Sequence, residues 1–146
     1  MPESSRSFLS GKPIPSRERL IVALDVPTTD RARELVRELG DSVCFYKIGL
    51  ELFMAGGYFE LARWLTEQGK KIFVDLKFFD VPETVASAVR QLQHMGAAFA
   101  TIHGNDAMLR AGAREKHGVG ILAVTALTSL DQKDMEDLGF RADIRD

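Results

Sequence analysis

Residues 73–85 read FVDLKFFDVPETV, and this stretch decides which fold and which chemistry we expect of the chain. Apolar residues occupy every second position through its first half, at Ile72, Val74, Leu76 and Phe78. That period of two is typical of a β-strand with one apolar face, and Asp75 and Lys77 lie on the opposite face. Opposite charges on a buried strand, with Asp80 three residues further on, indicate either a structural ion pair or a catalytic site.

The composition is that of one globular unit. The 146 residues can bury one core, and 45% hydrophobic with 27% charged residues is ordinary for such a domain. A formal net charge of -2 gives no general attraction to nucleic acid or to an anionic membrane, so neither is an expected partner. The single cysteine, Cys44, lies in an apolar run and is expected to be a buried, unreactive thiol.

The N-terminal residues predict no targeting segment. The sequence has no apolar run of about 18 residues and no apolar stretch typical of a secretory signal, so we expect a cytoplasmic protein. Residues 1–17 are rich in Ser, Pro and Arg and are expected to form a flexible lead. Residues 18–146 are expected to form one domain.

Five strand-then-helix units follow one another along that domain. The expected strands are residues 19–26, 42–52, 70–78, 97–104 and 120–128, and the expected helices are residues 28–40, 56–69, 81–96, 105–118 and 129–140. Thr28 or Thr29 suits the start of the first helix, because a threonine hydroxyl can accept from a free backbone N–H there. The repeated alternation predicts an α/β protein with a parallel sheet.

The helices also predict which side chains face the core. Three helical stripes are apolar: Leu35, Val36 and Leu39; Phe59, Leu61, Trp64 and Leu65; and Val85, Val89 and Leu92. Charged residues outside these stripes are expected to be solvated, among them Arg31, Arg33, Lys70 and Lys71.

Two architectures have this alternation, an open doubly wound sheet and the closed (β/α)8 TIM barrel. Asp25 to Pro27 stand where a dinucleotide-binding sheet would have its glycine-rich turn, which disfavours the open sheet. Polar residues gather late in the strands or just beyond them, at Asp25, Lys47, Asp75, Lys77, His103 and Thr128. Because barrel enzymes keep their chemistry at that rim, we expect a TIM-barrel type fold with about the first five of eight units.

Four motifs of the chain closely resemble, in order and spacing, those of the orotidine 5'-phosphate decarboxylase family. They are VALDV (22–26), FYKIGLEL (45–52), VDLKFFDVPETV (74–85) and AVTALTS (123–129). The D-x-K-x-x-D string followed by P-x-T is specific. The resemblance covers residues 19–129 and implies a TIM barrel that acts as a homodimer, with no metal and no organic cofactor, to convert orotidine 5'-phosphate to UMP in pyrimidine biosynthesis. It also implies a C-terminal truncation, because the later strands that grip the substrate phosphate are not in the sequence.

The resemblance implies roles for individual residues. Asp25 would bind the ribose, Lys47 would join the charge network beside it, and Asp75 and Lys77 would face the reacting carbon. Thr128 would lie beside the pyrimidine. Two further residues, Asp80 and Thr84, would reach into the site of the neighbouring subunit.

The expected chemistry accounts for these residue types. Loss of CO2 leaves a carbanion at C6 of the pyrimidine, which needs a cation already in place, and Lys77 can serve as that cation and then protonate C6. Asp75 would repel the substrate carboxylate. An alternating array of Lys47, Asp75, Lys77 and Asp80 would leave no buried charge without an opposite neighbour.

Other readings remain open from the sequence. The Mg2+-dependent sugar-phosphate decarboxylases and synthases of the same superfamily share the D-x-K-x-x-D string, but they place a glutamate near the second strand, where Lys47 stands here, and a lysine repels a cation. The chain could instead be a non-catalytic half-barrel that serves as an assembly or binding element. His103 can be a hydrogen-bonded structural histidine or a ligand contact.

Overall fold

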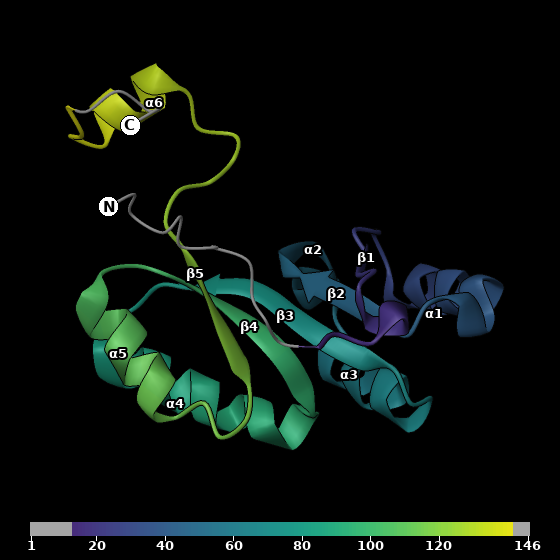
Figure 1. Cartoon of the computed structure of the whole chain (residues 1–146). Helices are drawn as coiled ribbons and strands as arrows, with labels where there is room; N and C mark the ends of the chain where they lie inside the picture. Colours follow the sequence, from purple (N-terminus) through teal and green to yellow (C-terminus); the bar gives the residue numbers. More distant parts are fainter. Residues whose placement is uncertain (1–12, 142–146) are drawn as a thin grey trace, which may run out of the picture.

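The computed structural model describes residues 13–141, in which five parallel strands form one sheet (Figure 1). The strands are β1 (Val22–Ala23), β2 (Phe45–Gly49), β3 (Lys71–Phe78), β4 (Ala97–His103) and β5 (Gly120–Val124). The helices are α1 (Thr29–Leu39), α2 (Leu50–Ala55), α3 (Tyr58–Glu67), α4 (Pro82–Leu92), α5 (Asp106–Arg114) and α6 (Gln132–Asp137), with short 3-10 turns at Ser16–Glu18, Gly40–Ser42 and Gln93–Met95. Residues 1–12 of the expected flexible lead lie outside the described residues.

The predicted strand-helix alternation is confirmed. Each strand pairs in parallel with the next strand along the chain, in the order β1-β2-β3-β4-β5, so β1 and β5 are the edges of the described sheet. The helices α1, α3, α4 and α5 line the sheet, whereas α6 lies apart from it at the end of the segment that follows β5 (Figure 1). No helix among residues 13–141 is both long and apolar enough to cross a membrane.

Three predicted strands are too long. The strand expected at 19–26 shrinks to β1, and the one expected at 120–128 ends at Val124. The run 42–52 divides at Gly49, after which Leu50 begins α2. A short apolar run fits a strand and a buried helix equally well, so its period alone could not locate that division.

The helix predicted at residues 56–69 is α3, which begins two residues later than predicted and exposes a different face. Gly56 and Gly57 have φ angles of 83° and 71°, which glycine adopts without strain, and they form the link between α2 and the start of α3 at Tyr58. The buried stripe of α3 is Tyr58, Leu61, Ala62 and Leu65. The prediction that Phe59 is a core residue is wrong: it is 57% exposed, because neighbouring Tyr58 takes the inward position.

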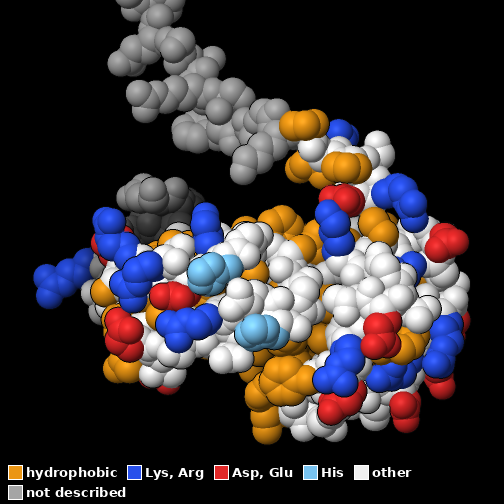
Figure 2. Space-filling view, turned by 90° about the horizontal axis from the view of Figure 1, so that it is seen from below, with side chains coloured by type: hydrophobic (Ala, Val, Ile, Leu, Met, Phe, Trp, Pro, Cys, Tyr) orange, Lys and Arg blue, Asp and Glu red, His pale blue; other side chains and the backbone are white. Residues whose placement is uncertain are grey.

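The other helical stripes are largely as predicted. Val36 of α1 and Val85, Val89 and Leu92 of α4 are buried, and Leu35 and Leu39 pack against the core at partial exposure. Thr28 caps α1, with its hydroxyl accepting from the backbone N–H of Arg31. Between α3 and α4 a mostly apolar hollow of about 190 Å3 remains, lined by residues that include Phe53, Phe59, Leu92 and Met95. Figure 2 shows hydrophobic side chains gathered on this face of the molecule between two more charged regions.

Several cations expected to be solvated make specific contacts instead. Lys70 donates to the carbonyls of Gly40 and Val43 at 2.6 and 2.9 Å, and so satisfies acceptors left free after the end of α1. Lys71 pairs with Glu18 at 2.6 Å. Arg33 and Arg37 lie over the ring of half-buried Trp64, with guanidinium carbons 4.9 and 5.5 Å from its centroid.

The two faces of α3 predict different costs of truncation. Leu61→Ala removes a side chain with no exposed surface, so we expect it to lower the free energy of unfolding by about 2–5 kcal/mol. Phe59→Ala removes a larger but half-exposed ring and should cost less, about 1 kcal/mol. Urea unfolding followed by circular dichroism measures both; an equal or larger loss for Phe59→Ala would contradict the observed orientation of α3.

Candidate active site

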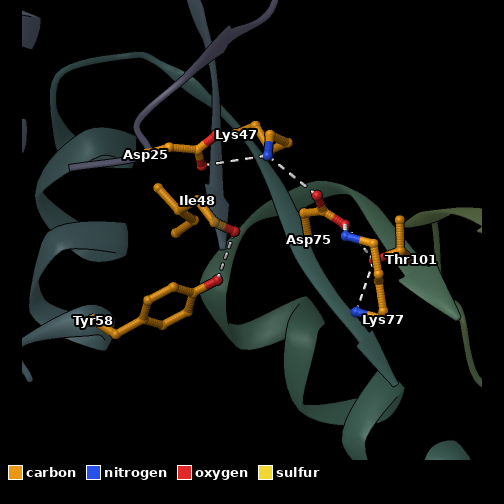
Figure 3. Close-up of polar contacts among 7 residues, drawn as sticks. All are labelled: Asp25, Lys47, Ile48, Tyr58, Asp75, Lys77 and Thr101. Carbon is orange, nitrogen blue, oxygen red and sulfur yellow. Dashed lines mark hydrogen bonds and ion pairs between the residues drawn. The ribbon is translucent and has the colours of Figure 1, made fainter. Parts of the chain in front are cut away.

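Four charged side chains meet at the carboxyl ends of three neighbouring strands (Figure 3). Asp25 follows β1, Lys47 belongs to β2, and Asp75 and Lys77 belong to β3. The Lys47 Nζ lies 3.4 Å from Asp25 Oδ1 and 3.2 Å from Asp75 Oδ2. The Lys77 Nζ lies 2.9 Å from the other oxygen of Asp75, so two lysines hold one carboxylate from its two sides.

Asp75 is the least exposed member of this cluster, with 12% of its side chain accessible. Burial by itself opposes its ionisation. Hydrogen bonds from Lys77, Thr101 and Lys47 outweigh that cost and hold the pKa of Asp75 below its ordinary value. The site is therefore built around a carboxylate that stays charged.

The pairing of β3 with β4 is irregular in the stretch of β3 that carries Asp75 and Lys77. Val74 pairs with Ala100 and Phe78 pairs with Ile102, so β3 fits two more residues than β4 into this interval. Lys77 has a φ of 46°, an uncommon left-handed conformation for a residue other than glycine. This bulge changes the direction of the chain at the lysine, as bulges beside active sites often do.

Thr101 of β4 is the residue that sequence reasoning missed. Its hydroxyl donates to Asp75 Oδ1 at 2.9 Å and accepts from the backbone N–H of Lys77 at 2.9 Å. Its position two residues before His103 in the expected strand was the available signal, since it places the side chain on the same face as the polar residue at the strand end.

Tyr58 supports the same site from behind β2. Its hydroxyl donates to the carbonyl of Ile48 at 3.2 Å, one residue beyond Lys47 (Figure 3). Burial, and after it the negative charge of Asp75, raise the pKa of Tyr58 above its ordinary value. Tyr58 therefore stays a neutral donor and holds the end of β2.

Four other predicted residues lie outside this hydrogen-bonded cluster. Asp80 is exposed and accepts from the N–H of Val81 at 2.7 Å, just before α4, and Thr84 is exposed in the first turn of that helix. Within this one chain, contacts between members of the expected charge array join Lys47, Asp75 and Lys77. Thr128 lies in an exposed turn beyond β5, and His103 packs its ring 6.0 Å from that of Phe79.

Asp80 and Thr84 nevertheless share with Lys77 the lining of a hollow of about 290 Å3. Lys77, Phe79, Asp80 and Thr84 all line it. Among residues 13–141, no group of three His, Cys, Asp or Glu side chains could hold a metal ion. The position between the carboxylates of Asp25 and Asp75 is taken by the ammonium of Lys47.

The lowered pKa of Asp75 predicts a pH-dependent contribution to stability. A carboxylate whose pKa is depressed by folding stabilises the native state above its ordinary pKa, about 4, and loses that contribution as the pH falls through its folded value. The difference in free energy of unfolding between the wild type and Asp75→Asn should therefore shrink as the pH falls from 6 to about 3. Urea titrations at several pH values measure it, with the exposed Asp41→Asn as the matched control; a difference that does not change with pH would contradict the assignment.

Comparison with known proteins identifies the family of the chain. The family model described as "Orotidine 5'-phosphate decarboxylase / HUMPS family" matches residues 18–145. An orotidine 5'-phosphate decarboxylase of Methylococcus capsulatus is 60% identical over 140 residues, which cover 96% of this chain and 58% of that protein. One from Rhodopseudomonas palustris is 52% identical over 135 residues, covering 91% and 56%. The chain thus spans somewhat more than half the length of these relatives.

Solved structures give the same relation. The crystal structure of orotidine 5'-phosphate decarboxylase from Lactobacillus acidophilus superposes with a TM-score of 0.77 at 35% sequence identity, covering 86% of this chain and 61% of that one. A structure of the enzyme from Methanocaldococcus jannaschii, complexed with the inhibitor BMP, superposes with a TM-score of 0.64 at 25% identity, covering 73% and 51%. The five units are therefore of TIM-barrel type, as predicted, and the chain belongs to the orotidine 5'-phosphate decarboxylase / HUMPS family.

Proposed function

We propose that this chain carries the reacting site of an orotidine 5'-phosphate decarboxylase, which converts orotidine 5'-phosphate to UMP in the cytoplasm. The observation that carries the proposal is the part-buried Asp75 carboxylate held between the ammonium groups of Lys47 and Lys77. The relatives named for this activity and the family match support the same substrate.

In the proposed reaction Lys77 supplies both a charge and a proton. The bond between C6 and the carboxylate breaks, CO2 leaves, and the electron pair stays on C6, where the ammonium of Lys77 stabilises it and then donates a proton. An ammonium has three N–H donors, and the described residues give that of Lys77 one partner, Asp75. With 35% of its side chain exposed, Lys77 can direct the remaining donors at a ligand.

Asp75, Lys47 and Asp25 have supporting roles in the proposal. Asp75 fixes the direction of the Lys77 ammonium and places negative charge next to the substrate carboxylate. Lys47 neutralises Asp75 from the other side, so that Asp75 remains ionised. Asp25 is 60% exposed and is proposed to bind the ribose, while Thr128 is proposed to lie beside the pyrimidine.

The proposed reaction uses no metal and no organic cofactor. A magnesium ion needs oxygen ligands that converge on one point. Here Asp25 and Asp75 converge on the ammonium of Lys47, which supports the cofactor-free reaction over the Mg2+-dependent chemistry of the superfamily.

A homodimer is proposed, with Asp80 and Thr84 reaching the neighbouring site. Both side chains are exposed at the rim where β3 ends. Large apolar side chains are exposed around the same rim, in α2 and in the segment after β3: Leu50, Phe53, Met54, Phe79 and Val81. Such a patch suits association with a second copy of the chain.

A second candidate is a non-catalytic element that assembles with another polypeptide. It is favoured by the open edges at β1 and β5 in the described sheet, beside which Leu20, Ile21 and Leu122 are exposed. Size-exclusion chromatography with a melting curve separates the candidates: a cooperative dimer supports the independent enzyme, and aggregation supports the incomplete element.

The proposal predicts that turnover depends on Lys77. The assay follows the rate at which the absorbance of orotidine 5'-phosphate decreases with the purified 146-residue chain. In Lys77→Ala this rate should be at least about 100-fold lower, because a positioned proton donor contributes that much or more. Binding of UMP should stay largely intact, since no carbanion forms with the product.

Lys116→Ala, at an exposed position in the turn before β5, is the matched control and should leave turnover unchanged. Near-normal turnover by Lys77→Ala would refute its role. A folded wild-type chain without turnover would favour the second candidate.

The dimer proposal predicts complementation between two inactive variants. In the proposed dimer each site takes Lys77 from one chain and Asp80 from the other. In a hybrid of one Lys77→Ala and one Asp80→Ala chain, both substitutions therefore fall in one site and the other site is intact. Hybrids purified through two different affinity tags should therefore recover about half of the wild-type activity per dimer. Hybrids as inactive as their parents would show that Asp80 serves its own subunit's site or none.

A further inference from the structure

The next inference deepens the proposed function and rests on it. We infer that Thr101 is a positioning residue of this site, whose hydroxyl fixes the backbone of Lys77 and the carboxylate of Asp75 relative to each other. Thr101 would not touch the substrate. It would determine where the ammonium of Lys77 points.

Three hydrogen bonds close a ring around the Thr101 hydroxyl. The backbone N–H of Lys77 donates to Oγ1 at 2.9 Å, and Oγ1 donates to Asp75 Oδ1 at 2.9 Å. The Lys77 Nζ donates to the same carboxylate oxygen at 2.9 Å. Thr101 therefore contacts Lys77 directly at its backbone and, through Asp75, at the end of its side chain.

The bulge in β3 explains why a side chain is needed at this point. The shifted register removes the stretch between Val74 and Phe78 from regular pairing with β4. The Lys77 N–H would then lack a partner at a part-buried position, and Thr101 supplies the acceptor. It also holds a φ of 46° that a lysine seldom adopts unless its surroundings enforce it.

The burial of Thr101 argues for positioning over substrate binding. Thr101 is only 5% exposed, and apart from the two buried tyrosines, Tyr46 and Tyr58, it is the one polar residue in the buried core of residues 13–141. A hydroxyl has one hydrogen to donate, and Asp75 takes it. No donor remains for a ligand.

Thr101 is also the neutral member among the side chains that act on Asp75. The others, Lys47 from β2 and Lys77 from β3, are both charged. Tyr58 of α3 feels the charge of Asp75, but its hydroxyl donates to the carbonyl of Ile48. Removing the hydroxyl therefore changes geometry and hydrogen bonding without changing the net charge of the site.

The test compares Thr101→Val, which keeps the shape, with Thr101→Ser, which keeps the hydroxyl. The first readout is the ionisation of Asp75, followed by NMR of 13C-labelled aspartate during a pH titration. The second is hydrogen exchange of the Lys77 amide. In Thr101→Val we expect the acid ionisation constant of Asp75 to fall about tenfold and the Lys77 amide to exchange about tenfold faster, the size of one lost hydrogen bond. Thr101→Ser should match the wild type in both.

Thr66→Val is the matched control. It removes a hydroxyl that donates to the carbonyl of Arg63 at 2.7 Å within α3, away from the site, and should move neither readout. If Thr101→Val does not fold, Thr101→Ala against Thr101→Ser gives the same comparison, because these two differ only in the hydroxyl.

The inference is overturned if Thr101→Val or Thr101→Ala keeps both values of the wild type, or if Thr101→Ser loses them. Both readouts are taken without substrate, so they judge Thr101 alone. Failure of the wild-type chain to consume orotidine 5'-phosphate would instead count against the proposed function. If the wild-type chain consumes orotidine 5'-phosphate, Thr101→Val should lower kcat several-fold at nearly unchanged KM, because the ammonium of Lys77 is misdirected while the substrate contacts remain.

Discussion

The part-buried carboxylate of Asp75 is the constraint on which the rest of the site depends. A carboxylate with so little exposed surface is unstable unless its oxygens receive hydrogen bonds and opposite charge. Those donors come from three strands: Lys47 on β2, Lys77 on β3 and Thr101 on β4. Because all three donors must reach one carboxylate, they tie the registers of β2, β3 and β4 to one another at the carboxyl ends of the strands.

Much of the fold follows from local pattern, and the exceptions have local causes. Periodicity identified five strand-helix units, and the buried stripe of Val85, Val89 and Leu92 was recognisable because it repeats at helical spacing. The division between β2 and α2 at Gly49 was not, since the run around it is apolar on both sides. The outward turn of Phe59 depends on where the two preceding glycines let α3 begin, and that is a property of the backbone rather than of hydrophobicity.

The site was predictable in its residues and less so in its geometry. A period of two placed Asp75 and Lys77 on one face, and the parallel sheet brought Lys47 beside them. The alternating array was expected to include Asp80, and within one chain the Asp80 carboxylate accepts from the backbone N–H of Val81 before α4. The bulge at Lys77 contains no glycine that would have indicated it in the sequence. Thr101 is uncharged, so the pattern of charged residues at the strand ends did not include it. Both arise from contacts between strands distant in sequence, which a single-strand pattern does not contain.

The site divides its hydrogen bonds between those that hold it together and those left for a ligand. Thr101 donates to Asp75 and accepts from the N–H of Lys77, and Asp75 receives donors on both oxygens, so neither can rearrange without leaving a part-buried group unpaired. Lys77 is the member whose ammonium keeps N–H groups beyond its one ion pair, and it is also more exposed than Asp75. A fixed carboxylate and a fixed backbone therefore hold this ammonium beside the hollow at the rim. An anion bound there would meet the positive charge of Lys77 in an orientation already set before binding, which is the condition under which electrostatic stabilisation of a developing negative charge is most effective.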